Sequence, residues 1–120
     1  MDYKVVKNNN KKYIECISNN KELCSEQNIS DVISICFQYD INKLILHSKI
    51  LSEDFFNLKT GLAGIMLQKF INYHIKVALI LNDEIILNER FKEMIMESNK
   101  GNSFRTFNNI KDGEKWILSL

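Results

Sequence analysis

The chain has 120 residues, with 16 lysines and arginines against 15 aspartates and glutamates, which leaves a formal net charge of +1. This length is typical of one domain with a single hydrophobic core. The basic residues are scattered along the chain, so no basic stripe predicts binding to nucleic acid or to a membrane surface. The apolar runs, such as VALIL at 77–81, are much shorter than the ~20 residues of a membrane-spanning helix.

The three cysteines, Cys16, Cys24 and Cys36, are odd in number and have no CxxC spacing. This pattern favours reduced thiols in a cytoplasmic protein over a disulfide framework. The chain also begins with an acid and a lysine rather than with an apolar secretory segment. We expect the cysteines to be buried as small hydrophobic side chains.

The segment DYKVVKNNNKKYIECI (2–17) predicts two short strands, joined by a tight turn at the asparagines 8–10. Asparagine tolerates the left-handed conformation that hairpin turns require. The polar segment 18–28 follows as a loop, and Asn28 is the expected N-cap of a first helix. That helix is expected to end near Asp40. Its predicted buried face consists of Ile29, Val32, Ile33 and Cys36.

Two apolar runs, KLILH (43–47) and KVALIL (76–81), predict strands that are buried on both faces of a parallel sheet. Between them, the segment 47–61 predicts a loop with a short turn of helix at 52–56. A second helix is expected to start at Thr60. Its apolar stripe consists of Leu62, Ile65, Met66, Phe70 and Tyr73.

Asn88 is the expected N-cap of a third helix, and Gly101 is its expected end, because glycine readily adopts the left-handed conformation after a helix. SFRTF (103–107) predicts the last strand, and the asparagines 108–109 open a final helix. Its predicted inner face consists of Gly113, Trp116, Ile117 and Leu120. The order predicts one α/β domain over residues 1–120, in which an N-terminal hairpin precedes alternating strands and helices in a mixed, mostly parallel sheet with helices on its faces.

This order, the glycine-bearing start of the second helix and the closing FRTFNNIKDGEKWI (104–117) resemble the STAS or SpoIIAA-like fold of anti-sigma-factor antagonists and sulfate-transporter tails. A closer resemblance is to a bacterial domain of unknown function, family 4180. The residues that carry this resemblance are SEDFFNLKTGLAGIMLQKFINYHIKVALI (52–80) and ESNKG (97–101). Where that family has a polar, serine-rich loop, this chain has NDEIILNER (82–90).

The family label implies no activity. The wider STAS resemblance implies a non-enzymatic, regulatory module that binds a protein partner and, in some members, is switched by phosphorylation of a hydroxyl at the start of the second helix. Thr60 occupies roughly this position, so the resemblance makes it a candidate phosphoswitch. Leu58 and Lys59 stand where the usual motif has an acid and a serine.

The start of the second helix is also a candidate binding edge on physical grounds. Ligands of parallel α/β sheets bind beyond the carboxyl ends of the strands, where helix N-termini present unpaired N–H groups. Thr60 and Gly61 are expected there, with Gly61 allowing close backbone approach and Gly64 allowing close helix packing. The alternative is that Thr60 only caps the helix and that the glycines only thin its packing face.

Further candidate binding residues flank this start. Phe55 and Phe56 are adjacent, so one ring is expected in the core and the other near the surface, as a partner anchor; burial of both rings is the alternative. The acids Glu53 and Asp54 and the cation Lys59 surround them. In ESNKG, a helix C-cap explains the lysine and the glycine but leaves the others less constrained. The candidate contacts there are Ser98, Asn99 and Lys100.

His47, Ser48 and Ser52 complete the candidate binding residues, and beside Glu53 and Asp54 they suggest a hydrolase only weakly. The chain has no GxSxG elbow, no phosphate loop and no GxGxxG motif. His74 is expected to close the second helix, and no cysteine pair or HExxH accompanies the histidines, so we expect no metal, no cofactor and no catalytic residue.

The sequence therefore favours a non-catalytic regulatory or protein-interaction module that uses the 47–61 loop and the start of the second helix. We expect His47, Thr60 and the two phenylalanines to share one rim. The alternative is a small-ligand or anion-binding domain, or a minor enzyme, in which His47, Ser52, Glu53 and Thr60 line a pocket. A third hypothesis is a homodimer through the apolar residues Ile85, Ile86 and Leu87.

Overall fold

The computed structural model describes residues 2–17, 23–81 and 88–120 of the chain. Within these ranges the strands are β1 (Tyr3–Asn8), β2 (Lys11–Cys16), β3 (Lys43–His47), β4 (Lys76–Ile80) and β5 (Phe104–Phe107). The α-helices are α1 (Glu26–Tyr39), α2 (Glu53–Phe56), α3 (Leu62–Asn72), α4 (Glu89–Asn99) and α5 (Ile110–Ser119). Two short 3-10 helices are η1 (Ser48–Ile50) and η2 (Leu58–Thr60).

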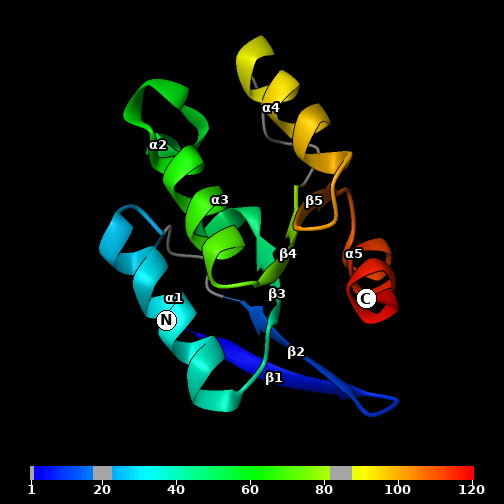
Figure 1. Cartoon of the computed structure of the whole chain (residues 1–120). Coiled ribbons are helices and arrows are strands. Elements are labelled where there is room, and N and C mark those ends of the chain that lie inside the picture. Colours follow the sequence, from blue (N-terminus) through cyan, green and yellow to red (C-terminus); the bar gives the residue numbers. More distant parts are fainter. Residues whose placement is uncertain (1, 18–22, 82–87) are drawn as a thin grey trace.

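The five described strands form one mixed sheet in the order β1-β2-β3-β4-β5 (Figure 1). β1 pairs antiparallel with β2, and all other neighbours are parallel. In the register of the central strands, Leu44 lies between Ile14 on one side and Val77 on the other. The predicted single α/β domain, with an N-terminal hairpin and a mostly parallel sheet, is confirmed.

The hairpin turn forms where the sequence predicts it. Asn9 and Asn10 have φ angles of 51° and 67°, the left-handed conformation that asparagine tolerates better than most residues. The predicted helical turn at 52–56 is also present, as α2.

The sheet has a large core on one face and a small core on the other, because successive strand residues point to opposite faces. On the first face, under α1, α2, α3 and α4, the sheet contributes residues such as Ile14, Leu44 and Val77. On the second face, Ile45 and Ala78 pack against α5. A side chain at the carboxyl end of a strand therefore lies either in the layer on the first face or in the layer on the second face.

α5 packs tightly onto the second face. Gly113 is buried there, and a Cβ at this position would lie 2.6 Å from Cδ1 of Ile80, so a larger residue would force the helix or Ile80 to move. The hydroxyl of Tyr13 donates a hydrogen bond to the Glu114 carboxylate. Burial and this hydrogen bond raise the pKa of Tyr13, so the phenol stays protonated and keeps α5 attached to β2.

Three local predictions are wrong in detail. The N-cap of α1 is Ser25 and not Asn28, because the Ser25 Oγ accepts a hydrogen bond from the Asn28 N–H at 3.3 Å. The Asn28 Oδ1 in turn accepts a hydrogen bond from the Ser25 hydroxyl at 2.8 Å. Gly101 has no positive φ, and α4 ends at Lys100 in right-handed conformation. Cys24 is exposed, whereas Cys16 and Cys36 are buried as expected.

Burial of Cys36 predicts a pH dependence of stability. It raises the pKa of this thiol from its ordinary 9.0 to about 11. Between these values the unfolded chain loses the thiol proton and the folded chain keeps it, so the free energy of unfolding decreases as pH rises through this window, by at most about 3 kcal/mol. Chemical denaturation of the wild type and of Cys36→Ala across this window should show the steeper decrease in the wild type. Parallel curves would contradict this assignment.

Candidate functional site

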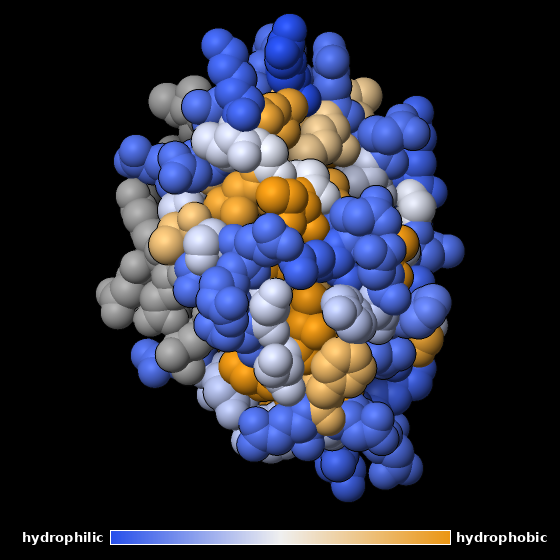
Figure 2. All heavy atoms as spheres, turned by 60° about the vertical axis from the view of Figure 1, so that its left-hand side comes forward, coloured by the Kyte–Doolittle hydropathy of each residue, from blue (hydrophilic) through white to orange (hydrophobic). Residues whose placement is uncertain are grey.

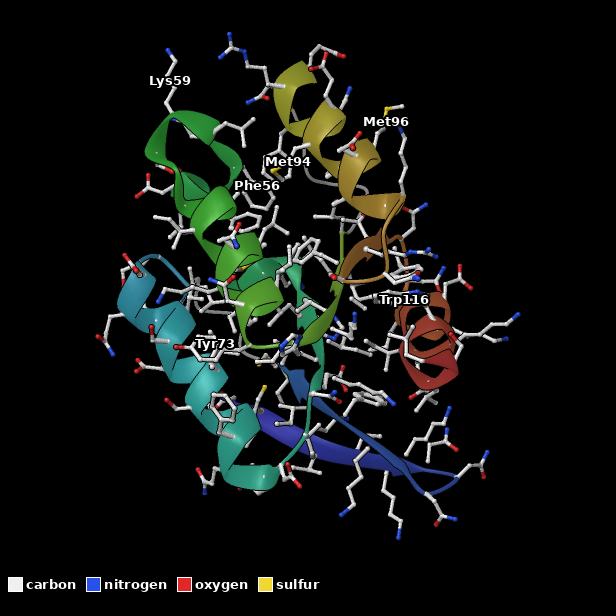
Figure 3. The ribbon with its side chains drawn as sticks, in the orientation of Figure 1. Phe56, Lys59, Tyr73, Met94, Met96 and Trp116 are labelled. Atoms are coloured by element: carbon white, nitrogen blue, oxygen red, sulfur yellow. The ribbon has the colours of Figure 1, made fainter. Side chains whose placement is uncertain are left out.

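A groove opens where η2 approaches the start of α4. It has a volume of about 370 Å³, and its walls come from two segments some thirty positions apart: Asn57, Leu58 and Lys59 on one side and Asn88, Glu89 and Arg90 on the other. The groove lies in the layer of α2, α3 and α4. In Figure 3, Lys59 projects outward from the tip of this layer. We call these six residues the η2–α4 groove.

Local hydrogen bonds hold the η2 wall of this groove. The Asn57 side chain accepts from the Lys59 N–H at 3.1 Å and so caps η2. The Thr60 hydroxyl lies 2.6 Å from the Asp54 carbonyl oxygen and 2.9 Å from that of Asn57, and can donate to either. It also accepts from the Leu62 N–H at 3.3 Å. These contacts give Thr60 a structural role in closing the turn before α3, and its role as a phosphoswitch stays a prediction.

The two glycines near this turn differ. Gly61 has a φ of 75° and links η2 to α3, so its left-handed backbone conformation explains the glycine. Gly64 was expected to allow close packing, but it is exposed, and no atom lies within 4 Å of where its Cβ would be. That expectation is wrong, because Gly64 lies on the outer face of α3.

Three phenylalanines pack together beneath the groove. The rings of Phe55 and Phe56 lie 5.7 Å and 5.3 Å from that of Phe91, measured between centroids. Phe55 is fully buried and Phe56 is half-buried, as expected for one core ring and one near the surface. Figure 3 shows Phe56 and Met94 in the space between α3 and α4. This cluster joins α2 to α4 and so sets the distance between the groove walls.

Asn88 connects the two walls by hydrogen bonds. Its Oδ1 accepts from the Phe91 N–H at 2.8 Å, which confirms it as the predicted N-cap of α4. Its Nδ2 donates to the Phe56 carbonyl oxygen at 3.5 Å. The α4 wall therefore starts at a defined position relative to α2.

The groove carries excess positive charge. Glu89 is paired with Lys92 at 3.5 Å, one turn further along α4. Among the residues that the structure describes, neither Lys59 nor Arg90 lies within ion-pair distance of a carboxylate. The unpaired N–H groups and positive dipole end of α4 add to this charge.

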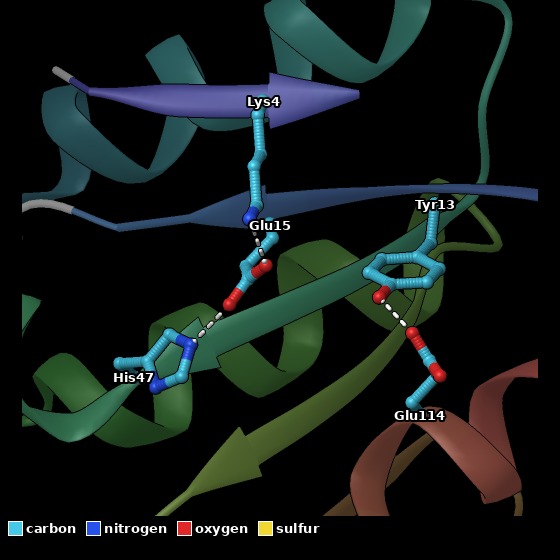
Figure 4. Close-up of polar contacts among 5 residues, drawn as sticks. All are labelled: Lys4, Tyr13, Glu15, His47 and Glu114. Atoms are coloured by element: carbon cyan, nitrogen blue, oxygen red, sulfur yellow. Dashed lines mark hydrogen bonds and ion pairs between the residues drawn. The ribbon is translucent and has the colours of Figure 1, made fainter. Parts of the chain in front are cut away.

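His47 does not lie at this groove. It projects to the opposite face of the sheet, where its Nε2 donates to the Glu15 carboxylate at 2.6 Å and the Lys4 ammonium lies 3.4 Å from the same carboxylate (Figure 4). Glu15 is only 8% exposed. The expected common rim of His47, Thr60, Phe55 and Phe56 is therefore not formed, because the sheet separates His47 from the others.

The other candidate residues of the 47–61 segment divide between core and surface. Ser48 is buried in η1, and the Oγ of Ser52 is buried without a hydrogen-bond partner among the described residues. Glu53 and Asp54 are exposed in the first turn of α2. Only Lys59 of the predicted site residues lines the η2–α4 groove.

The ESNKG segment has a structural role centred on Asn99. Its Oδ1 accepts from the Thr106 backbone N–H at 2.8 Å, and its Nδ2 donates to the Thr106 hydroxyl at 3.2 Å. Ser98 donates to the Ile95 carbonyl oxygen, and Lys100 is exposed, with its Nζ 3.5 Å from Glu97. The Asn99 side chain thus provides the hydrogen-bond acceptor for a backbone N–H of β5, an edge strand of the sheet.

Asn99→Ala is expected to lower the free energy of unfolding by about 1 kcal/mol, because the half-buried Thr106 N–H loses its acceptor. Thermal denaturation checks this expectation. Lys100→Ala is the matched control, since its exposed ion pair contributes little, and it should leave the melting temperature nearly unchanged. An Asn99→Ala variant as stable as the wild type would instead favour a contact role for Asn99.

Sequence reasoning missed Asn57, Glu89, Arg90 and Glu15 as members of these clusters. The strand alternation carries a signal for Glu15, because it shares a face with Tyr13 and so points toward the second core. No local signal pairs residues 57–59 with residues 88–90. The proposed dimer residues Ile85, Ile86 and Leu87 lie outside the described residues.

Two further features are absent from the described residues. No three histidine, cysteine, aspartate or glutamate side chains among them could hold a metal ion together. None of the described helices combines the length and the apolar character needed to cross a membrane.

The chain belongs to a defined family. A family model for a domain of unknown function, DUF4180, matches residues 8–117. The match covers nearly the whole chain, so the chain belongs to the DUF4180 family, as its sequence resemblance predicts. No curated protein and no solved structure matches it, so the resemblance to STAS domains stays a prediction.

Proposed function

We propose that this chain is a non-catalytic protein-interaction module and that the η2–α4 groove binds a partner segment that carries a carboxylate beside an apolar side chain. The observation that carries this proposal is the groove itself, which Lys59 and Arg90 line from two different segments. A carboxylate entering between them would form charge-assisted hydrogen bonds. The apolar part of the segment would pack against Leu58.

The position of the groove and the contacts that hold its walls favour binding of a partner over catalysis. Its walls are held by the phenylalanine cluster and by Asn88, so the backbone segments that carry the two cations lie at a defined separation. Preorganised surfaces lose less conformational entropy on binding. The imidazole of His47 is on the other face of the sheet, which favours a binding role over an enzymatic one. Among the described residues, the thiols of Cys24 and Cys36 are unpaired, which supports a cytoplasmic location for this module.

The experiment uses charge reversal on the two walls. A partner captured from the source organism by the wild-type chain should be lost with Lys59→Glu and with Arg90→Glu. Affinity for the purified partner should decrease by about tenfold or more in each variant, which is about 1.4 kcal/mol. Lys111→Glu, an exposed reversal on α5, is the matched control and should bind as the wild type. Equal capture by all three variants would exclude the groove as the contact surface.

The alternative function is binding of a small anion in the same groove. It is favoured by the unpaired N–H groups at the start of α4, which borders the groove that Lys59 and Arg90 line. Thermal shift with inorganic phosphate separates the alternatives. Stabilisation by phosphate that disappears in Arg90→Glu would support the anion site. No stabilisation by phosphate, together with partner capture that depends on charge, would support the protein-interaction module.

A further inference from the structure

A second pocket lies at the opposite end of the parallel strands, where α1 and α3 end. Its volume is about 280 Å³. The floor is formed by the buried side chains of Cys36, Ile41 and Ile75, and the mouth is formed by Phe37, Asp40, Asn42 and Tyr73. This pocket shares no residue with the η2–α4 groove, so it calls for a separate explanation.

Two exposed aromatic rings form a corner at the mouth of this pocket. Phe37 is 61% exposed and Tyr73 is 47% exposed. Their ring centroids are 5.6 Å apart, and their planes are nearly perpendicular, at 82°. Figure 3 shows Tyr73 beside α1, and Figure 2 shows this side of the molecule with hydrophobic patches between hydrophilic side chains. A pair of large exposed rings at a pocket typically marks a binding site, because folding alone gains little from them.

The electrostatics of the mouth favour a cation. α1 and α3 both end there, so the negative ends of two helix dipoles meet at the pocket. Asp40, held in left-handed conformation with a φ of 54°, adds a carboxylate at the end of α1. The faces of aromatic rings also attract cations, through their quadrupoles.

The lysines near this end either point away from the pocket or are paired with a carboxylate. The Nζ of Lys43 donates to the Leu120 carbonyl oxygen, on the second face of the sheet, and Lys76 is its register partner on β4. The Nζ of Lys69 lies 3.4 Å from the Glu26 carboxylate. His74 follows Tyr73 directly, in left-handed conformation with a φ of 58°.

The floor of the pocket is apolar and uncharged. Ile41 and Ile75 contribute only hydrocarbon, and the buried thiol of Cys36 stays protonated, because burial raises its pKa to about 11. Such a floor suits alkyl groups and offers no partner to a strongly hydrated metal ion. The ligand should therefore combine a positive charge with methyl or methylene surface.

We propose that this pocket binds an alkylammonium group, held by Phe37, Tyr73 and Asp40 over the apolar floor. Cation–π attraction from the two rings and the Asp40 carboxylate provide the selectivity for charge. The alkylammonium group belongs either to a methylated lysine side chain of a protein or to a free small molecule. Both sources share the chemistry that the pocket recognises.

The first experiment uses choline and 3,3-dimethyl-1-butanol, which has the same shape but no charge. Amide resonances of the chain are followed by NMR during titration of each probe. Choline should shift the resonances of Phe37, Asp40 and Tyr73, and the uncharged alcohol should bind about tenfold more weakly or not at all, because cation–π attraction and the carboxylate act on the charge alone. Equal binding of the two probes would overturn the proposal.

Variants test the same site. Phe37→Ala and Asp40→Asn should each weaken choline binding by about tenfold. Both positions are exposed, and asparagine tolerates the left-handed conformation of residue 40, so folding should be preserved. Met96→Ala, at another exposed apolar side chain, is the control and should leave choline binding unchanged. Unchanged choline affinity in folded Phe37→Ala and Asp40→Asn proteins would also refute the site.

A third titration separates the two sources of the ligand. A short peptide that contains trimethyl-lysine should bind more tightly than choline if the natural ligand is a protein side chain, and no more tightly if it is a free small molecule. Lys59→Glu and Arg90→Glu should leave choline binding unchanged, because they alter only the η2–α4 groove. The two proposals can therefore fail independently.

Discussion

Phe91→Ala should lower the free energy of unfolding by about 3 to 5 kcal/mol, the cost typical of removing a buried phenylalanine. Phe91 is fully buried and contacts the rings of Phe55 and Phe56, which belong to a helix more than thirty residues earlier in the chain. The alanine would leave a cavity at the contact between α2 and α4. Urea denaturation followed by tryptophan fluorescence measures the loss.

The same change should disturb the groove, because Phe91 directly follows the wall residues Asn88, Glu89 and Arg90. We expect amide resonances of residues 57–59 to shift in a folded Phe91→Leu variant, which keeps most of the packing volume. Met96→Ala on the same helix is the control, since Met96 is 66% exposed and should change stability by less than about 0.5 kcal/mol. If Phe91→Ala were as stable as this control, the phenylalanine cluster would not hold the two walls.

Trp116→Ala should cost about 3 kcal/mol and weaken the attachment of α5 to the sheet. Trp116 is 9% exposed, lies 5.8 Å from Phe107 between ring centroids, and has the Arg105 guanidinium 5.4 Å above its ring. Among the described helices, α5 is the one that packs in the small core of the second face. Loss of its largest side chain should therefore affect that face most.

Unfolding of this variant is followed by far-UV circular dichroism, because Trp116 is the single tryptophan of the chain and its removal abolishes the tryptophan fluorescence signal. Hydrogen exchange should show faster exchange in α5 and in the adjacent parts of β3 and β4, with little change in α1 and α3. Ile110→Ala, at an exposed position of the same helix, should be nearly neutral. Uniformly faster exchange across both layers would contradict a local effect on α5.

Elements formed by neighbouring residues were predictable. The apolar spacing of α1 and α3, the asparagine turn at residues 9 and 10, the N-cap Asn88 and the asparagine pair 108–109 that opens α5 all depend on contacts within a few positions. The short apolar strands likewise indicated a parallel sheet. Errors of a few residues, such as the N-cap at Ser25 in place of Asn28, arose because both side chains can cap the same turn.

The sites depended on pairs of distant segments. His47 and Phe55 are eight residues apart, yet the sheet lies between them, and His47 instead meets Glu15 through the register of β2 and β3. The groove exists because the phenylalanine cluster packs η2 beside α4, and the aromatic corner exists because α1 and α3 end side by side.

The sequence by itself thus determined the family, through its matching residues, and the order of strands and helices with the N-cap Asn88, because these follow from short-range periodicity and hydrogen bonding. Only the tertiary structure decided which cations line one groove and which rings share a pocket. Such pairings depend on the packing of whole layers and on which face of the sheet each helix covers, and no local stretch of sequence encodes that choice.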